Sequence, residues 1–124
     1  VGDVAKKGHE QYVADLKGDK RLVGGNHDGD MTRFSGLFTE YHGCKYLPGL
    51  LLTHVPVHPT QVGQYTANVH GHLHGGFIKH DRYLCVSVDQ TGFRPISRAK
   101  VDWLLARSHL RRYPMPEPTR VRAA

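Results

Sequence analysis

The sequence predicts a small α/β domain. Short β-branched or apolar runs of strand length recur along the chain, and the continuous apolar run at residues 50–53 is typical of a buried strand. Near the C-terminus, Val101, Leu104 and Leu105 instead follow the i, i+3, i+4 spacing of a helix face. At 124 residues, the chain can form one domain with a modest core.

The first half of the chain predicts short strands alternating with short helices. Residues 1–5 resemble the end of a strand. Residues 8–18 are expected to form an amphipathic helix closed by Gly18, because Tyr12, Val13 and Leu16 share one face. Residues 20–23 then predict a strand that stops at two glycines, and residues 31–37 are expected to hold one helical turn.

The remaining elements follow from the same periodicities. A helix is expected over residues 96–110, and prolines 56 and 59 predict a loop after the buried strand. The proline-rich end cannot be helical, so we expect a domain over residues 1–112 and an extended or disordered Pro/Arg-rich tail over residues 113–124. Further strands are expected at residues 38–41, 44–46, 67–70 and 83–88.

The positive charge is confined to the last third of the chain. Residues 1–90 contain nine Lys/Arg and nine Asp/Glu, whereas residues 91–124 contain eight Lys/Arg and two Asp/Glu, a difference of 8 − 2 = +6. This region is either a solvated helix face with a tail, or a surface for an acidic partner such as nucleic acid. The basic residues are Arg94, Arg98, Lys100, Arg107, Arg111, Arg112, Arg120 and Arg122.

Cysteine usage and hydropathy predict a reduced, cytoplasmic protein. Cys44 and Cys85 form no CxxC pair and no disulfide framework, which argues against a cysteine-zinc site. No stretch approaches the roughly 18 apolar residues of a membrane span, and no signal peptide is visible. We therefore expect no membrane association.

Four polar clusters carry the functional information, and each follows an apolar or β-branched run. Asp, Asn and His together form a ligand set for a divalent ion. Taken singly, each cluster also has a structural explanation, such as a turn at a strand end or a solvated aspartate. The clusters are Gly2-Asp3, Gly25-Asn26-His27-Asp28, Thr53-His54 and Gly71-His72-Leu73-His74.

The residue types within these clusters suggest separate roles. His72 and His74 lie two positions apart, so on extended backbone their rings point to the same side and can reach one ion or two adjacent ions. Asn26 offers a neutral carbonyl oxygen, His27 a proton donor, and Asp28 a carboxylate that can orient an imidazole. The histidines outside these clusters are interpreted as surface or structural residues: His9, His42, His58, His70, His80 and His109.

In this order, the four clusters resemble those of the calcineurin-like metallophosphoesterase superfamily. The resemblance runs from residue 2 to about residue 96. Residues 68–74 and 83–88, followed by Pro95-Ile96 and a helix, are similar to the small bacterial and phage branch.

The resemblance implies a two-sheet sandwich flanked by helices, with two divalent ions sharing a bridging carboxylate and a bridging hydroxide. Asp3 would bridge the ions, and His74 would belong to the second ion. His27 would protonate the leaving oxygen, oriented by Asp28. Mn²⁺, Fe, Zn²⁺ and Mg²⁺ are all compatible with these ligands. The first ion would be completed by Asn26, His54 and His72.

The family's first motif, an Asp-x-His on the opening strand, would lie before residue 1, so the resemblance also implies an N-terminally incomplete fold. One ion would keep four ligands, while the other would keep only Asp3 and His74, and a single ion is one expectation for this chain. The sequence given is then a piece of a longer protein, a natural truncation, or a chain whose partner supplies the missing strand.

We expect a metal-dependent phosphoesterase, either a phosphodiesterase or a phosphatase. It would hydrolyse a small or nucleotide-like phosphate ester by a metal-activated hydroxide. The alternative is a truncated, non-catalytic relative that acts as a binding or structural protein, with the basic C-terminal region as its contact surface. A zinc-stabilised nucleic-acid module is disfavoured, because paired cysteines and a ligand repeat are lacking.

Overall fold

Two β-sheets organise residues 1–107, the part of the chain that the computed structural model describes. In the smaller sheet, β1 (Arg21–Val23) pairs in parallel with β2 (Glu40–His42). The larger sheet has the order β3-β4-β5-β6, in which β3 and β4 are antiparallel and the other pairs are parallel. Its strands are β3 (Cys44–Leu47), β4 (Leu50–Thr53), β5 (Ala67–His70) and β6 (Tyr83–Cys85).

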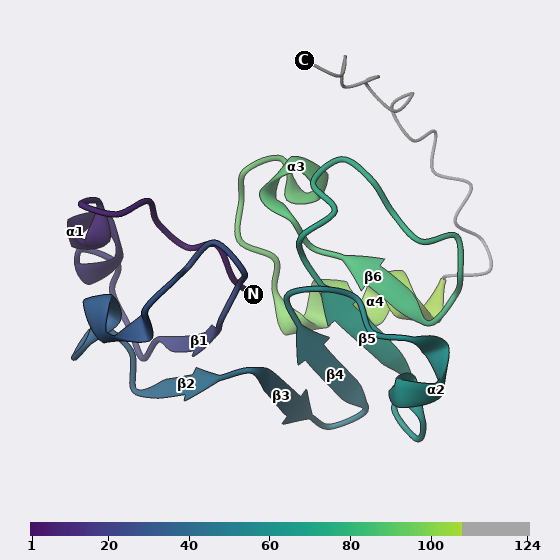
Figure 1. Ribbon diagram of the computed structural model, residues 1–124. Coiled ribbons are helices and arrows are strands. Elements are labelled where there is room, and N and C mark those ends of the chain that lie inside the picture. The colour runs from purple at the N-terminus through teal and green to yellow at the C-terminus, as the bar shows by residue number, and fades with distance from the viewer. Residues whose placement is uncertain (108–124) are drawn as a thin grey trace, which may run out of the picture.

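Short helices connect these strands, and α4 covers the larger sheet. The Ser97 hydroxyl starts α4 by accepting a hydrogen bond from the amide of Lys100, as an N-cap residue does. Figure 1 shows α4 lying behind β5 and β6, and the N-terminus lying between the two sheets. The helices are α1 (Glu10–Ala14), the 3-10 turn η1 (Met31–Phe34), α2 (Pro59–Val62), α3 (Val88–Thr91) and α4 (Arg98–Ala106).

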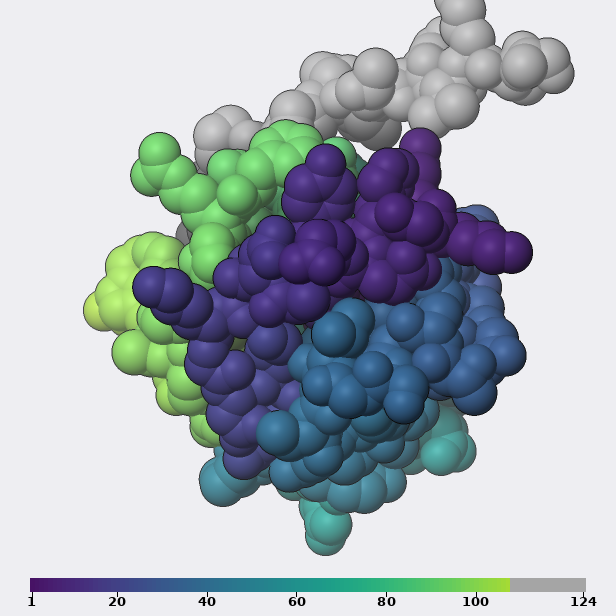
Figure 2. Space-filling model, turned by 90° about the vertical axis from the view of Figure 1, so that its left-hand side faces the viewer, coloured from purple at the N-terminus to yellow at the C-terminus, as the bar shows by residue number. Residues whose placement is uncertain are grey.

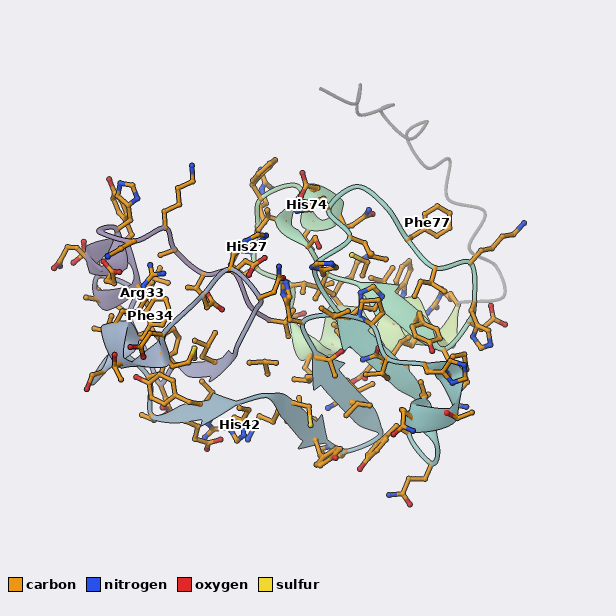
Figure 3. All side chains as sticks on the ribbon, in the orientation of Figure 1. His27, Arg33, Phe34, His42, His74 and Phe77 are labelled. Carbon is orange, nitrogen blue, oxygen red and sulfur yellow. The ribbon has the colours of Figure 1, made fainter. Side chains whose placement is uncertain are left out.

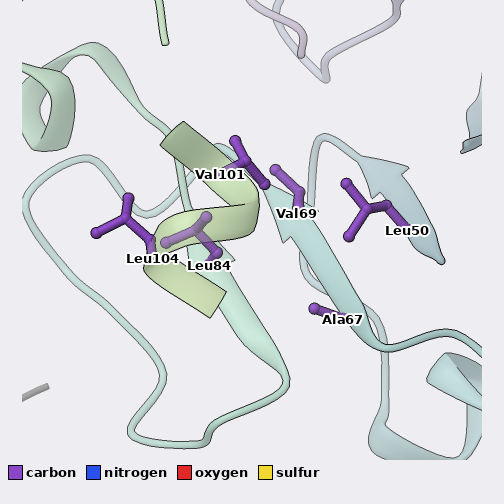
Figure 4. Packing of buried hydrophobic residues seen from close by; sticks show 6 residues of the cluster. All are labelled: Leu50, Ala67, Val69, Leu84, Val101 and Leu104. Carbon is purple, nitrogen blue, oxygen red and sulfur yellow. The ribbon is translucent and has the colours of Figure 1, made fainter. Parts of the chain in front are cut away.

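The main hydrophobic core lies between α4 and the larger sheet (Figure 4). Val101 and Leu104, which the sequence places on one helix face, are both buried there. The strand residues that meet them are equally apolar, so this burial is the main source of stability for this part of the fold. Those strand residues are Leu50, Ala67, Val69 and Leu84.

A charged network joins the smaller sheet to the larger one. The carboxylate of Glu40 on β2 pairs with Arg21 on β1 at 3.1 Å and with Lys45 on β3 at 2.6 Å. The ring of His42 lies 2.6 Å from the same carboxylate. The hydrogen bonds from Lys45 and His42 lower the pKa of Glu40 to about 2, so this carboxylate is ionised over the whole neutral range.

The predicted α/β class is confirmed, and most predicted strands and helices are present. The strand predicted at residues 1–5 is wrong, because these residues form a loop. The strand predicted at 83–88 ends at Cys85, and the loop predicted after β4 contains α2, which has Pro59 in its first turn. The predicted tail lies outside the described residues, and within them no helix is long and apolar enough to cross a membrane.

We expect Glu40→Gln to destabilise the protein at pH 7, and the effect to vanish in acid. Because folding lowers the pKa of Glu40 to about 2 from 4.5, its contribution is present above pH 4.5 and is lost as the pH falls toward 2. Urea unfolding midpoints measured from pH 7 to pH 2 test this. Asp81→Asn, which alters an exposed carboxylate, is the control. A decrease in the urea midpoint of equal size at every pH would contradict the prediction.

Candidate metal centre

Three strand ends and the N-terminal segment meet at one place. β1, β4 and β5 lead directly into the segments that contain Asn26, His54 and His72. The amide of Gly71 donates to the carbonyl of His54 at 3.0 Å, which joins the ends of β4 and β5. The carboxyl ends of parallel strands are where binding sites gather in α/β sheets. In Figure 2 the N-terminal segment, in purple, lies across this side of the molecule between green and blue segments.

Four side chains that the sequence singled out converge there. The Nε2 atom of His54 lies 3.1 Å from Oδ2 of Asp3 and 2.9 Å from Oδ1 of Asn26. The Nδ1 atom of His72 lies 3.1 Å from the same Asn26 oxygen and 3.3 Å from Nε2 of His54. Asp3, His54 and His72 bring ligand atoms within 4.8 Å of one another. The predicted four-residue group is therefore assembled.

The tautomer of His54 directs a lone pair into this group. Its Nδ1 atom lies 3.2 Å from the carbonyl oxygen of Val1, and a carbonyl can only accept, so the proton is on Nδ1. The Nε2 lone pair of a neutral ring then faces the oxygens of Asp3 and Asn26, which are also electron-pair donors. Such an arrangement of donors is stabilised by a cation between them, or by protonation of the rings.

The spacing of the donors suits a single ion. Two ligands about 2.1 Å from a shared ion are about 3.0 Å apart in octahedral geometry and about 3.4 Å apart in tetrahedral geometry. The four contacts among these donor atoms lie between 2.9 and 3.3 Å. The donor set, with one carboxylate, one amide oxygen and two imidazoles, fits a divalent ion such as Mn²⁺, Fe²⁺ or Zn²⁺.

The backbone is strained at three residues of the predicted set. Asp3, His72 and His74 have φ values of 51°, 65° and 50°, in the left-handed region. His72 is the centre of a tight turn in which the amide of Leu73 donates to the carbonyl of Gly71 at 2.8 Å. Left-handed conformations at non-glycine residues cost on the order of 1–3 kcal/mol each and cluster at functional sites.

Asp28 stabilises the backbone beneath the site through its buried carboxylate, instead of orienting His27 as predicted. Its carboxylate is fully buried and accepts the amides of Asp3 at 2.9 Å, Val4 at 2.8 Å and Gly25 at 2.6 Å. Within the described residues no hydrogen bond joins it to the ring of His27, so the predicted orienting role is wrong. The buried carboxylate instead draws the backbone of Asp3 against the turn after β1, because buried charge requires hydrogen-bond partners.

Two glycines allow this close approach. A Cβ atom on Gly25 would lie 2.3 Å from Oδ1 of Asp3, and one on Gly2 would lie 2.3 Å from Nδ1 of His54. Both distances are far below van der Waals contact, so the backbone and the ligands can approach this closely only at glycine.

His27 and His74 lie at the edge of the group rather than within it. His27 is exposed, and its amide donates to Oδ1 of Asp3 at 2.8 Å, so the residue lies at the edge of the site (Figure 3). The His74 side chain is 80% exposed, and its Nδ1 atom pairs with Asp89 at 3.5 Å. Among the described residues, the group of ligand atoms that lie within 4.8 Å of one another includes Asp3, His54 and His72 but not His74.

Sequence reasoning missed Arg33, whose side chain joins the segments around the site. Its guanidinium donates to the carbonyls of Ala5 at 2.6 Å and Asp28 at 3.1 Å, and it pairs with Glu10 at 2.8 Å. Figure 3 shows it with Phe34 beside α1, where it lies 4.6 Å from the ring centroid of Phe34. A single arginine next to a phenylalanine carries no sequence signal for this role.

His70 was interpreted as structural, and it lies fully buried behind the site. Its Nδ1 atom lies 2.9 Å from the carbonyl of Gly71, the same carbonyl that closes the turn at His72. Burial lowers the pKa of His70, which favours the neutral ring. Among buried side-chain nitrogens and oxygens of the described residues, its Nε2 is the one that has no hydrogen-bond partner.

Comparison with known proteins supports the fold and leaves the function open. No family model and no curated protein matches the chain. A solved structure, the protein of unknown function AQ665 from Aquifex aeolicus, is similar with a TM-score of 0.62 and 26% sequence identity. The match covers 84% of this chain and 73% of that chain.

Gly25→Ala should weaken Mn²⁺ binding. The added methyl group would displace Asp3 from the other donors, and we expect the affinity to fall at least about tenfold. Isothermal titration calorimetry measures this. Gly43→Ala is the matched control, because a Cβ atom there would meet nothing within 4 Å. Equal Mn²⁺ affinity in both variants would show that the close approach at Gly25 is unimportant.

Asp28→Asn should destabilise the fold. An amide group offers a single acceptor oxygen and brings an NH₂ group toward backbone amides that also donate. We expect a loss of about 1–3 kcal/mol in the free energy of unfolding, measured by urea denaturation. Asp30→Asn, at the exposed cap of η1, is the comparison and should cost less. A smaller loss for Asp28→Asn than for Asp30→Asn would contradict the role given to Asp28.

Proposed function

We propose that this protein is a metal-dependent phosphoesterase, a phosphodiesterase or phosphatase. The observation that carries the proposal is the convergence of Asp3, Asn26, His54 and His72, whose donor atoms are linked by four contacts of 2.9 to 3.3 Å. These residues would hold the cation. A bound divalent ion supplies the positive charge needed by the anionic phosphoryl group and lowers the pKa of a bound water.

The chain's own residues supply the remaining requirements. His54 is buried and fixed through its Nδ1 atom, so it keeps its lone pair directed at the site. Asn26 and His27 are exposed, and the Asp3 side chain is one-quarter exposed, so a substrate can reach the donor group from solvent. His27 would then give a proton to the departing oxygen, and the contact of its backbone amide with Asp3 supports this role by keeping the residue beside the donor group.

The order of the motifs supports a more specific fold assignment. We infer that the two sheets are those of the calcineurin-like metallophosphoesterase sandwich. The Gly-Asp, Gly-Asn-His-Asp, Thr-His and Gly-His-x-His clusters resemble that family, and three of them directly follow or end β1, β4 and β5. A substrate with a small or nucleotide-like leaving group suits a donor group that is open to solvent.

Hydrolysis of bis(p-nitrophenyl) phosphate with added Mn²⁺ tests the proposal. We expect His27→Ala to lower turnover about a hundredfold or more while Mn²⁺ affinity is kept, because its ring lies outside the donor group. His54→Ala should abolish both Mn²⁺ binding and turnover. His9→Ala, which removes an exposed histidine whose side chain makes no cap hydrogen bond, is the control and should behave like the parent.

Two results would overturn parts of this proposal. Full activity of His27→Ala would remove the proton-donor role. Absence of hydrolysis at saturating Mn²⁺ would favour the alternative, a non-catalytic binding protein.

The surface of α4 supports that alternative. Trp103 is 46% exposed, and the Nζ atom of Lys100 and the Cζ atom of Arg107 lie 3.9 Å and 4.4 Å from its ring centroid. Such an exposed group of positive charges could bind an acidic partner. Removal of residues 111–124 should then weaken a salt-sensitive interaction.

A further inference from the structure

Asn68 on β5 is a fully buried polar residue that has no part in the donor group. Its side-chain amide makes three hydrogen bonds, and all three partners lie within residues 51–57, the segment that contains His54. β4, which begins this segment, is the neighbour of β5 in the larger sheet (Figure 1). Beyond Thr53 the chain leaves β4, so its backbone groups need hydrogen-bond partners other than a strand ladder.

The partners of Asn68 fix the orientation of its amide group. The backbone amide of Val57 can only donate, so the atom that faces it at 3.0 Å is Oδ1. The carbonyl of Leu51 can only accept, so the atom that faces it at 3.0 Å is Nδ2. The second N–H of Nδ2 donates to Oγ1 of Thr53 at 2.9 Å. Both donors and the acceptor oxygen of this buried amide are therefore used.

The hydroxyl of Thr53 extends this hydrogen-bonded group past His54. Its oxygen accepts from Asn68, and its proton is donated to the carbonyl of Val55 at 2.7 Å. The residues immediately before and after His54 are thus joined to one buried side chain, and Val57 is joined to the same side chain by its amide. The backbone on both sides of His54 is fixed by these contacts.

This fixed backbone determines where the ring of His54 lies. His54 is 5% exposed, its carbonyl accepts from the amide of Gly71 at 3.0 Å, and its Nδ1 atom lies 3.2 Å from the carbonyl oxygen of Val1. Its Nε2 atom then faces the oxygens of Asp3 and Asn26. Groups that bind a ligand together have to be held within about 0.5 Å of their productive positions.

We propose that Asn68 is a positioning residue, which acts through the hydroxyl of Thr53 to hold His54 in the donor group. The proposal rests on the proposed metal-dependent function. The three hydrogen bonds of Asn68 go to backbone and hydroxyl groups of residues 51–57, so its effect on a bound cation is transmitted by that segment. Partners that orient metal ligands in this way change metal affinity about 10- to 100-fold when they are removed.

A purely structural role is the competing explanation. Asn68 would then only satisfy buried backbone groups, and its removal would lower stability without changing the affinity of the folded protein for a cation. Val101→Ala provides the comparison, because it removes apolar contacts from the core beneath α4 and leaves the segment around His54 intact. The two explanations therefore differ in whether metal affinity falls by more than a loss of stability alone produces.

Calorimetric titration of the full chain with Mn²⁺ tests the proposal. We expect Asn68→Leu to weaken binding about 10- to 100-fold, and Thr53→Val, which removes only the hydroxyl, to weaken it about tenfold. Thr53→Ser keeps the hydroxyl and should bind like the parent. Thr66→Val, at an exposed threonine before β5, is the matched control and should also bind like the parent. Urea unfolding midpoints of all variants are measured alongside.

The outcomes separate this proposal from the proposed function. If His54→Ala abolishes Mn²⁺ binding while Thr53→Val binds like the parent, the role of Asn68 is refuted and the metal centre stands. Equal losses of affinity in Thr53→Val and Val101→Ala, or in Thr53→Val and Thr53→Ser, would also refute it. If the parent chain binds no Mn²⁺, both proposals fall. Thr53→Val leaves Asn68 in place, so it decides the question even where Asn68→Leu does not fold.

Discussion

The arrangement of the site depends on the buried carboxylate of Asp28. It is fully buried and accepts three backbone amides, two of which belong to residues 24 and 25 positions away in the chain. A buried carboxylate without partners would be strongly destabilising, so the folded chain has to bring the amides of Asp3 and Val4 to it. That requirement places the side chain of Asp3 next to His54.

The side chain of Arg33 joins the N-terminal segment to the turn after β1 a second time. Arg33 donates to the carbonyls of Ala5 and Asp28, so the same two segments are joined through amides on one side and through carbonyls on the other. The Arg33 side chain is 17% exposed, and its pairing with Glu10 satisfies the remaining part of the guanidinium. The N-terminal segment, which belongs to no strand, is therefore held by polar contacts rather than by strand pairing.

The site has a strained backbone and is accessible to solvent, and these two features together are typical of a functional site. Left-handed backbone at Asp3 and His72 is unfavourable in itself, and the facing electron-pair donors of Asp3, Asn26, His54 and His72 repel one another until a proton or a cation lies between them. A structure optimised only for stability would avoid both features. The likeness to AQ665 supports the fold, while the argument for function comes from these donor atoms and their spacing.

Local sequence patterns determined much of this protein. The apolar run of β4, the helix face of Val101 and Leu104, and the positions of the polar clusters after strands are all readable from residues close together in the chain. These features could be predicted because strand and helix periodicities depend on neighbouring residues. The resemblance of the ordered polar clusters to a known enzyme family, rather than any local periodicity, predicted that Asp3, Asn26, His54 and His72 would share one centre.

Only the tertiary structure decided which contacts hold that centre in place. The loop at residues 1–5 is held by contacts between distant parts of the chain. Asp28 accepts the amides of Asp3 and Val4, which are 25 and 24 positions away, and Arg33 donates to the carbonyl of Ala5, 28 positions away. Such contacts arise because buried polar groups must find partners wherever folding brings them. No periodicity in the sequence records which partner that will be, so the candidate ligands could be predicted and the residues that hold them in place could not.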